Sequence, residues 1–288
     1  MRPVAIVTDS THYLARELIE QAGVKEVSLY VRSGERAERE SEIRDYDAFF
    51  AGLAAGGELP STSQPSIGDF VDVYEPLLAA GSDIISIHLS AGLSGTTGAA
   101  LQAKALLEER GGASGRLEVI DSQTAGGGLG CVVLAAIAAR QAGGDIDAVC
   151  ERALAARSAM RLWFCVDTLE YLQRGGRIGR AAAWIGGALQ IKPILSVESE
   201  IYPVERVRTA GRAFERMVEY MQELRDSGAD AWVVQHVQAP QRAAELVARG
   251  RQVFGGDPLW VSEVGPVIGT YTGPGLIGVG GLQAALLA

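Results

Sequence analysis

Short apolar runs alternate with amphipathic segments through the first half of the chain. The runs have the length of buried strands and the segments repeat with the helical period, which predicts strands alternating with helices. Such alternation is typical of a parallel sheet with helices on both faces. We expect strands at residues 4–7, 27–31, 83–88 and 117–120, and helices at residues 14–22, 46–55, 67–80, 96–110 and 129–142. Residues 32–44 are charged and contain Gly and Ser, which predicts a surface loop.

The second half follows a different pattern, because two apolar runs flank the polar residues 198–200 and predict an antiparallel hairpin. We expect helices at residues 145–158, 167–175, 180–190, 210–227 and 240–251, and strands at residues 162–166, 194–197, 201–207, 231–237 and 259–264. Residues 265–281 are rich in Gly and Pro with short apolar runs, and we assign them no element. The sequence therefore predicts two lobes. Residues 1–158 form an α/β domain with a parallel sheet, and residues 159–288 form an α+β domain with a mixed or antiparallel sheet.

Hydroxyl side chains gather where the predicted strands of the first half end. The clusters are Thr8, Ser10 and Thr11; Ser90, Ser94 and Thr96; and Ser122 and Thr124. Ligands of open α/β sheets bind beyond the carboxyl ends of the strands, so this is the expected position of a site. Residues 60–66 are too rich in Pro and hydroxyls for a helix or a strand, and Ser66 with Asp69 is typical of a helix cap.

Composition disfavours several classes of protein. The net charge is −9 and the basic residues form no run, which argues against nucleic-acid binding. Cys131, Cys150 and Cys165 form no CxxC pair, which favours a reducing compartment. The longest apolar stretch, residues 131–139, is too short to cross a bilayer, and the N-terminus lacks a signal-peptide pattern. We therefore expect a cytoplasmic protein without stable membrane insertion, and no spacing indicates a metal or a cofactor.

Seven motifs occur in a specific order along the chain. They are TDST at residues 8–11, TSQPS at 62–66, LSGT at 93–96, GGRI at 175–178, KPIL at 192–195, VR at 207–208 and TGPG at 272–275. Each motif is weak alone, but the ordered set resembles the DegV family of bacterial fatty-acid-binding proteins. The resemblance extends from residue 4 to about residue 280.

The resemblance implies two α/β lobes that enclose one long-chain fatty acid. Its carboxylate would be held by Thr62 of the TSQPS segment and by Ser94 and Gly95 of the LSGT segment. The resemblance also implies that a separate fatty acid kinase, where an organism has one, would phosphorylate the bound ligand, so that the protein itself would not be an enzyme. Arg177 and Arg208 would line the mouth of the site and serve the acyl-phosphate or partner step.

One position departs from the family pattern. The family typically carries a histidine just before TGPG that supports the carboxylate-binding hydroxyls, whereas this chain has Tyr271. A phenol donates or accepts a hydrogen bond but stays neutral near pH 7. We expect Tyr271 to donate to the ligand carboxylate or to Thr62, or else to pack as an ordinary aromatic residue.

Two other interpretations stay open from the residues alone. A serine- or threonine-dependent acyl or phosphoester hydrolase would use Ser94 or Thr62 as the nucleophile, but GLSGT is not a nucleophile elbow and no histidine is paired with it. His88 and His236 lie in apolar strands, as core histidines do. A purely regulatory protein would have no buried ligand. Asp9 and Asp121 would repel a carboxylate, so we expect them to cap helices or order loops.

Overall fold

The computed structural model describes residues 2–56, 59–111, 115–185 and 191–288. Its first lobe contains a parallel four-stranded sheet in the order β2-β1-β6-β7. These strands are β1 (Val4–Asp9), β2 (Lys25–Val27), β6 (Asp83–His88) and β7 (Leu117–Asp121). All six residues of β6 are buried, because helices cover both faces of the sheet.

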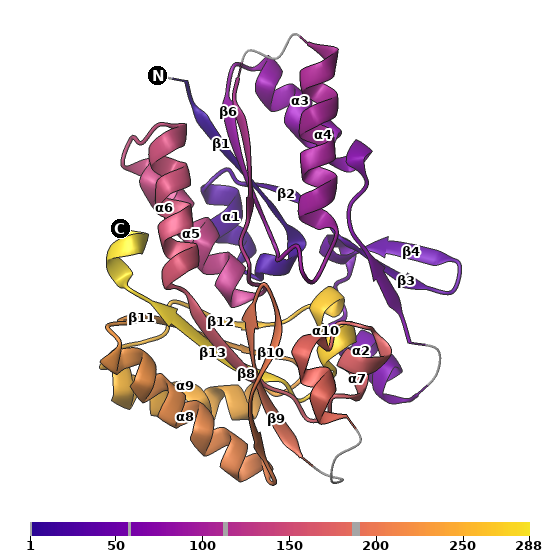
Figure 1. The fold of residues 1–288 in the computed structure, drawn as a ribbon, viewed down its shortest axis with the longest axis vertical. Coiled ribbons are helices and arrows are strands. Elements are labelled where there is room, and N and C mark those ends of the chain that lie inside the picture. The colour runs from indigo at the N-terminus through magenta and orange to yellow at the C-terminus, as the bar shows by residue number, and fades with distance from the viewer. Residues whose placement is uncertain (1, 57–58, 112–114, 186–190) are drawn as a thin grey trace.

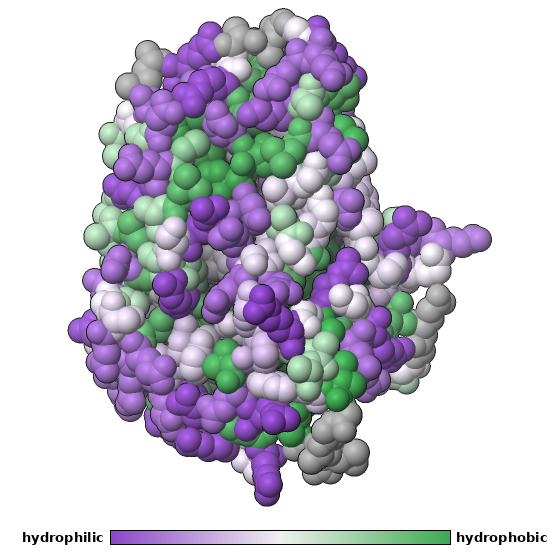
Figure 2. Space-filling model, in the orientation of Figure 1, coloured by the Kyte–Doolittle hydropathy of each residue, from purple (hydrophilic) through white to green (hydrophobic). Residues whose placement is uncertain are grey.

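The helices on the two faces form separate cores with the sheet (Figure 1). The cores use alternate residues of a strand, since Ile84 packs on one face and Ile85 on the other. One face is covered by α3 (Ile67–Ala79) and α4 (Thr96–Arg110), and the other by α5 (Gly127–Gln141) and α6 (Ile146–Ala159). The expected parallel α/β lobe is confirmed. Figure 2 shows hydrophobic residues between α4 and α6, over the edge of this sheet.

A mixed six-stranded sheet, β10-β9-β8-β13-β11-β12, forms the second lobe. Only β11 and β12 pair in parallel; the other neighbours are antiparallel, as expected for the predicted hairpin. The strands are β8 (Arg161–Cys165), β9 (Lys192–Glu198), β10 (Glu200–Val207), β11 (Ala231–His236), β12 (Val261–Glu263) and β13 (Ile277–Leu282). Two amphipathic helices, α8 (Ala210–Asp226) and α9 (Pro240–Phe254), pack against it.

The C-terminal Gly/Pro-rich stretch contains two elements that sequence patterns did not identify. These are α10 (Pro266–Thr272) and β13, which lies between β8 and β11 in the second sheet. The glycines that weaken the strand signal make room for neighbours: a Cβ at Gly280 would come within 2.4 Å of the Met160 Cε atom. Tertiary packing thus overrides the low strand propensity of glycine.

Three further expectations are wrong, and all three concern a third, small sheet in the order β4-β3-β5. The expected loop 32–44 holds a hairpin of β3 (Tyr30–Ser33) and β4 (Arg36–Arg39), which projects to the right in Figure 1. Its third strand, β5 (Ser61–Ser63), lies in a segment expected to lack regular structure. The single strand expected at residues 27–31 is divided between β2 and β3, which belong to different sheets. Short exposed strands of polar residues carry little periodic signal, which explains these errors.

The remaining elements are short helices and 3₁₀ turns. Short helices are α1 (Arg16–Gln21), α2 (Tyr46–Ala54) and α7 (Glu170–Arg174), with 3₁₀ turns η1 (Ser10–His12), η2 (Glu40–Glu42), η3 (Gly179–Trp184) and η4 (Ala284–Leu287). The helix expected at residues 180–190 is the 3₁₀ turn η3 as far as Trp184, and residues 186–190 lie outside the described part. The division near residue 158 stays a prediction. No helix within the described ranges is long and apolar enough to span a membrane.

Candidate functional site

A largely apolar cavity lies between the two lobes and opens to solvent. Leu29, Leu89 and Ala125 of the first lobe line one side, and Phe164 and Leu276 of the second lobe line another. Further lining residues are Thr62, Gln64, Leu93, Ser94, Gly126, Leu162, Leu172, Arg177, Val197, Ile201, Gln235, Val264, Val267, Ile268, Tyr271, Thr272 and Gly278. Neither lobe alone would enclose this space.

Thr62 and Tyr271 meet at the wall of the cavity. The Thr62 Oγ1 and Tyr271 Oη atoms lie 2.6 Å apart, although the residues are 209 positions apart in the sequence. The strand pairing of β5 with β3 places Thr62 opposite Val31, and α10 carries Tyr271. One hydroxyl proton is used in the contact between them, so the second proton is available to an acceptor in the cavity.

The LSGT segment reaches the cavity next to this pair. The Ser94 Oγ atom accepts a hydrogen bond from the Thr96 N–H over 3.3 Å and lies 2.9 Å from the Thr96 Oγ1 atom, at the start of α4. The Gln64 side chain packs closely on Gly95, where a Cβ would come within 2.7 Å of the Gln64 Nε2 atom. The missing side chain lets Gln64 of the TSQPS segment pack on the LSGT segment, and so both hydroxyl segments meet.

The two predicted arginines lie in different places. Arg177 lines the cavity, and its guanidinium carbon lies 4.8 Å from the centre of the Tyr271 ring, the geometry of a cation–π contact. It also donates to the Gly175 carbonyl over 2.9 Å. Arg208 is exposed beyond the end of β10 and does not line this cavity. The structure therefore brings Thr62, Ser94, Tyr271 and Arg177 together but leaves Arg208 apart.

Gln64 and Gln235 are cavity residues that sequence reasoning missed. Gln235 is 4% exposed within the apolar strand β11. Its Oε1 atom accepts a hydrogen bond from the Gly127 N–H, and its Nε2 atom donates to the Ser262 Oγ atom over 2.9 Å. A polar residue inside an otherwise apolar strand was the available signal.

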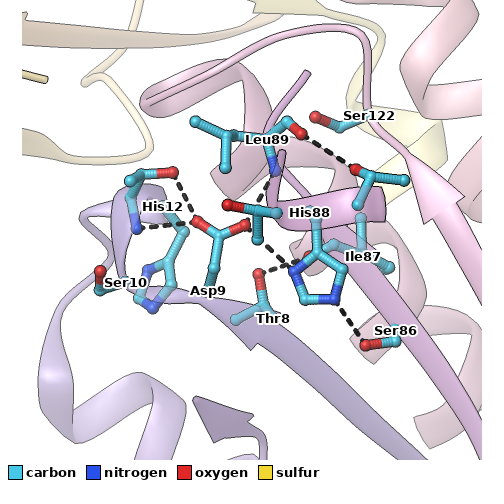
Figure 3. A network of polar contacts seen from close by, with 12 residues as sticks. Thr8, Asp9, Ser10, His12, Ser86, Ile87, His88, Leu89 and Ser122 are labelled. Carbon is cyan, nitrogen blue, oxygen red and sulfur yellow. Dashed lines mark hydrogen bonds and ion pairs between the residues drawn. The ribbon is translucent and has the colours of Figure 1, made fainter. Parts of the chain in front are cut away.

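A buried chain of polar side chains runs through the first lobe (Figure 3). The Tyr74 hydroxyl donates to Ser86, the Ser86 Oγ atom lies 2.7 Å from His88 Nε2, and His88 Nδ1 lies 3.1 Å from Asp9 Oδ2. These groups are those of a serine–histidine–aspartate triad, but His88 and Ser86 are 0% exposed and so inaccessible to a substrate. The expectation that His88 is a core histidine is confirmed.

Asp9 ends this chain and orders the strand ends. Burial alone would raise its pKa, but the hydrogen bond and charge attraction of His88, with hydrogen bonds from Thr11 and Leu89, hold the pKa below its usual value. Asp121 likewise accepts hydrogen bonds from the Ala91 and Gln123 N–H groups. Both aspartates order loops, as expected.

The other two histidines are also engaged away from the cavity hydroxyls. The His12 Nε2 atom lies 3.0 Å from the Glu26 Oε2 atom, and its Nδ1 atom accepts from the Leu14 N–H. The His236 Nδ1 atom accepts from the Ala239 N–H over 3.4 Å, and burial lowers the pKa of this imidazole. All three histidines are described, and none is positioned as a general base for Ser94 or Thr62. In the part of the chain that is described, no group of acids, histidines or cysteines could hold a metal ion.

The fold and the site define a two-lobed α/β protein with an apolar cavity between its lobes and hydroxyl groups at the cavity wall. A family model described as "Uncharacterised protein, DegV family" matches residues 3–283, and this chain belongs to that family. It is 41% identical over 282 residues to the DegV domain-containing protein SCO2569 of Streptomyces coelicolor, covering 96% of this chain and 98% of that protein. Protein DegV of Bacillus subtilis is 33% identical over 281 residues, covering 96% of this chain and 98% of that protein.

Solved structures agree with this assignment. The structure titled "Fatty Acid Binding of a DegV family Protein from Thermus thermophilus" is 32% identical, covers 98% of this chain and 100% of its own, and has a TM-score of 0.87. The B. subtilis DegV structure, titled as a fatty acid binding protein, has the same identity, coverage and TM-score.

Proposed function

We propose that this protein binds one long-chain fatty acid, with the acyl chain in the cavity and the carboxylate at Thr62, Ser94 and Tyr271. The main supporting observation is that these three hydroxyl side chains line one largely apolar cavity. The solved T. thermophilus and B. subtilis DegV structures, both described as fatty acid binding, support the same ligand class.

The chemistry of the lining suits a fatty acid. Burial of each methylene contributes about 0.8 kcal/mol, so a long chain supplies most of the affinity. A carboxylate is costly to bury unless donors meet it. The Thr62–Tyr271 pair and Ser94 offer hydroxyl donors, and Arg177 adds a positive charge beside them. Gln64 of the TSQPS segment packs on Gly95 of the LSGT segment, so the two hydroxyl segments are in contact.

We further infer that the protein presents the bound carboxylate to a separate fatty acid kinase in the cytoplasm. A hydrolase is disfavoured because no histidine is paired with Ser94 or Thr62. Arg177 at the cavity and the exposed Arg208 suit a negatively charged acyl phosphate or an acidic partner surface.

Mass spectrometry of an organic extract tests the ligand class. We expect a co-purified long-chain fatty acid in extracts of the wild type and much less in the double variant Thr62→Ala/Ser94→Ala. Ser66→Ala is the matched control, because Ser66 caps α3 and does not line the cavity. A wild-type extract without fatty acid, together with no binding of added palmitate, would contradict the proposal.

Acyl-phosphate formation tests the presentation step. The loaded protein is incubated with ATP and a purified bacterial fatty acid kinase catalytic subunit, and acyl phosphate is trapped with hydroxylamine. At saturating palmitate, needed because Arg177 also lines the cavity, Arg177→Ala and Arg208→Ala should lower the yield of acyl phosphate per molecule of bound palmitate. Arg225→Ala on α8 should not. Equal yields from free palmitate and from the loaded protein would argue against presentation.

A further inference from the structure

Glu40 places a buried carboxylate between the first lobe and α10. It is 2% exposed and begins η2. Its Oε2 atom accepts a hydrogen bond from Ser10 Oγ over 2.5 Å, and its Oε1 atom accepts from Tyr13 Oη over 2.9 Å and from the Val267 N–H over 2.8 Å. Among the described residues no lysine or arginine forms an ion pair with Glu40. The carboxylate is therefore stabilised by three neutral donors.

One of these donors belongs to α10, which forms part of the cavity wall. The Val267 N–H lies in the first turn of this helix, where backbone donors lack partners within the helix. The approach is close: a Cβ at Gly265 would come within 2.8 Å of the Glu40 Oε1 atom. Val267, Ile268 and Tyr271 of the same helix line the cavity, so Glu40 is joined to the site through α10.

We propose that ionised Glu40 is a positioning residue for the ligand site, holding α10 so that Tyr271 stays against Thr62, and that protonation of Glu40 loosens this hold. The inference rests on the proposed fatty-acid binding. Glu40 does not line the cavity and would not touch the ligand. It acts on the ligand only through the position of α10.

Protonation of Glu40 would weaken its hydrogen bonds, because all three neighbours donate to the carboxylate. A neutral carboxyl group is a weaker acceptor than a carboxylate, and its new proton needs an acceptor of its own. The Ser10 Oγ atom already accepts from the Leu29 N–H over 3.2 Å. Accommodating the proton therefore requires the hydrogen bonds around Glu40 to rearrange, including the one to α10.

The residues around Glu40 set the pH at which it gains a proton close to neutral. Burial raises the pKa of Glu40 to about 7; the hydrogen bonds of Ser10, Val267 and Tyr13 oppose the rise, and the charge of Glu26 adds to it. Glu26, on β2, is itself paired with His12. Burial raises the pKa of Tyr13, and also that of Tyr46 on α2, so both phenols stay neutral in this range. Glu40 also borders a second hollow, separate from the ligand cavity, and the other charged side chains that line this hollow include Arg16, Glu20, Glu42, Arg44 and Glu263.

Equilibrium dialysis of radiolabelled palmitate against delipidated full-length protein tests the inference between pH 5.5 and 8.5. The variants are Glu40→Gln, which cannot ionise, and Glu42→Gln, an exposed control in the same 3₁₀ turn. The ratio of the Glu40→Gln Kd to the wild-type Kd should be about 1 at pH 5.5 and rise to roughly fivefold or more at pH 8.5. The ionisation of palmitate cancels in this ratio. Glu42→Gln should follow the wild type throughout.

A ratio that does not change with pH, whatever its value, would overturn the inference, because a purely structural role gives a constant loss. Tyr13→Phe provides a second test should Glu40→Gln fold poorly. It removes one donor to the carboxylate, so the midpoint of the affinity profile should move to higher pH. An unmoved midpoint would also overturn the inference. Failure of the wild type to bind palmitate at any pH would instead refute the proposed function itself.

Discussion

Tyr271 makes two different contacts at the cavity wall, one through its hydroxyl and one through its ring. Its hydroxyl contacts Thr62 while its ring lies beneath the Arg177 guanidinium. A phenol cannot carry the positive charge that a histidine can gain, so in the proposed site the contribution of Tyr271 to carboxylate binding would be a neutral hydrogen bond. The nearby positive charge comes from Arg177, whose guanidinium lies over the ring and donates to the Gly175 carbonyl.

Removal of the phenol hydroxyl should weaken ligand binding. Tyr271→Phe keeps the ring under Arg177 but removes the partner of Thr62. A hydrogen bond of this kind contributes about 1–2 kcal/mol, so the Kd for palmitate should rise about 5- to 30-fold. Tyr202→Phe, whose ring stacks with Arg180 outside the cavity, is the control and should bind like the wild type. An unchanged Kd in Tyr271→Phe would remove its hydroxyl from the site.

Glu40 should also make the stability of the fold depend on pH. Its pKa is raised from 4.5 to about 7, so the folded state holds a proton that the unfolded state releases between these values. The stabilisation of the folded state by this proton is therefore fully present below about pH 4.5 and is lost as pH rises through about 7. Urea unfolding should show that the stability of the wild type relative to Glu40→Gln falls by on the order of 3 kcal/mol from pH 4.5 to pH 8. A constant difference across this range would contradict the assignment.

At the scale of elements, α7 and α10 pack through two rings and two glycines. The Tyr271 ring of α10 lies on Gly175 at the end of α7, where a Cβ would come within 2.2 Å of the Tyr271 Cδ1 atom. The Tyr171 ring of α7 lies on Gly273 in the same way. This explains physically why glycine occupies the first position of the GGRI motif: its lack of a side chain lets the aromatic ring reach its place beside Thr62.

Gly175→Ala should therefore displace Tyr271. Gly175 has φ −80°, so the expected effect is steric rather than a consequence of backbone strain. We expect a loss of about 1–3 kcal/mol in the free energy of unfolding, and weaker palmitate binding. Gly211→Ala on α8, where a Cβ meets no atom within 4 Å, is the control and should be neutral or slightly stabilising.

A double-mutant cycle identifies the cause. In a Tyr271→Ala background the cost of Gly175→Ala in the free energy of unfolding should largely disappear, because the clashing ring is absent. The same cost in both backgrounds would show that Gly175 is required for a different reason.

At the scale of the whole molecule, the cavity is built from both lobes, so a bound fatty acid would contact residues of both. Ligand that binds only the folded state adds about 2.7 kcal/mol of stability at a hundredfold excess over its Kd. Delipidated protein should therefore gain several degrees in Tm when palmitate is added, by differential scanning fluorimetry. Butyrate carries the same carboxylate without the long tail and should give almost no shift. Equal shifts with both acids would locate the binding energy outside the apolar cavity.

The sequence by itself determined the parallel first lobe, the hairpin of the second lobe and the family. Each leaves a signal in neighbouring residues: fully apolar runs such as β6, helical periodicity such as that of α8, and short motifs in a specific order. Asp9 and Asp121 were predictable for the same reason, because their bonding partners include residues only two positions away. The ordered motifs also identified Thr62 and Ser94 as candidates.

Only the tertiary structure decided the three-stranded sheet, the elements α10 and β13, and the meeting of Thr62 with Tyr271. β13 is rich in glycine and is stabilised by the strands on either side of it, so its own residues carry little strand signal. Thr62 and Tyr271 are brought together by the packing of both lobes across 209 positions of sequence, a distance over which no local pattern acts. The hydrogen bond from Val267 to Glu40 spans 227 positions and was invisible to sequence patterns for the same reason.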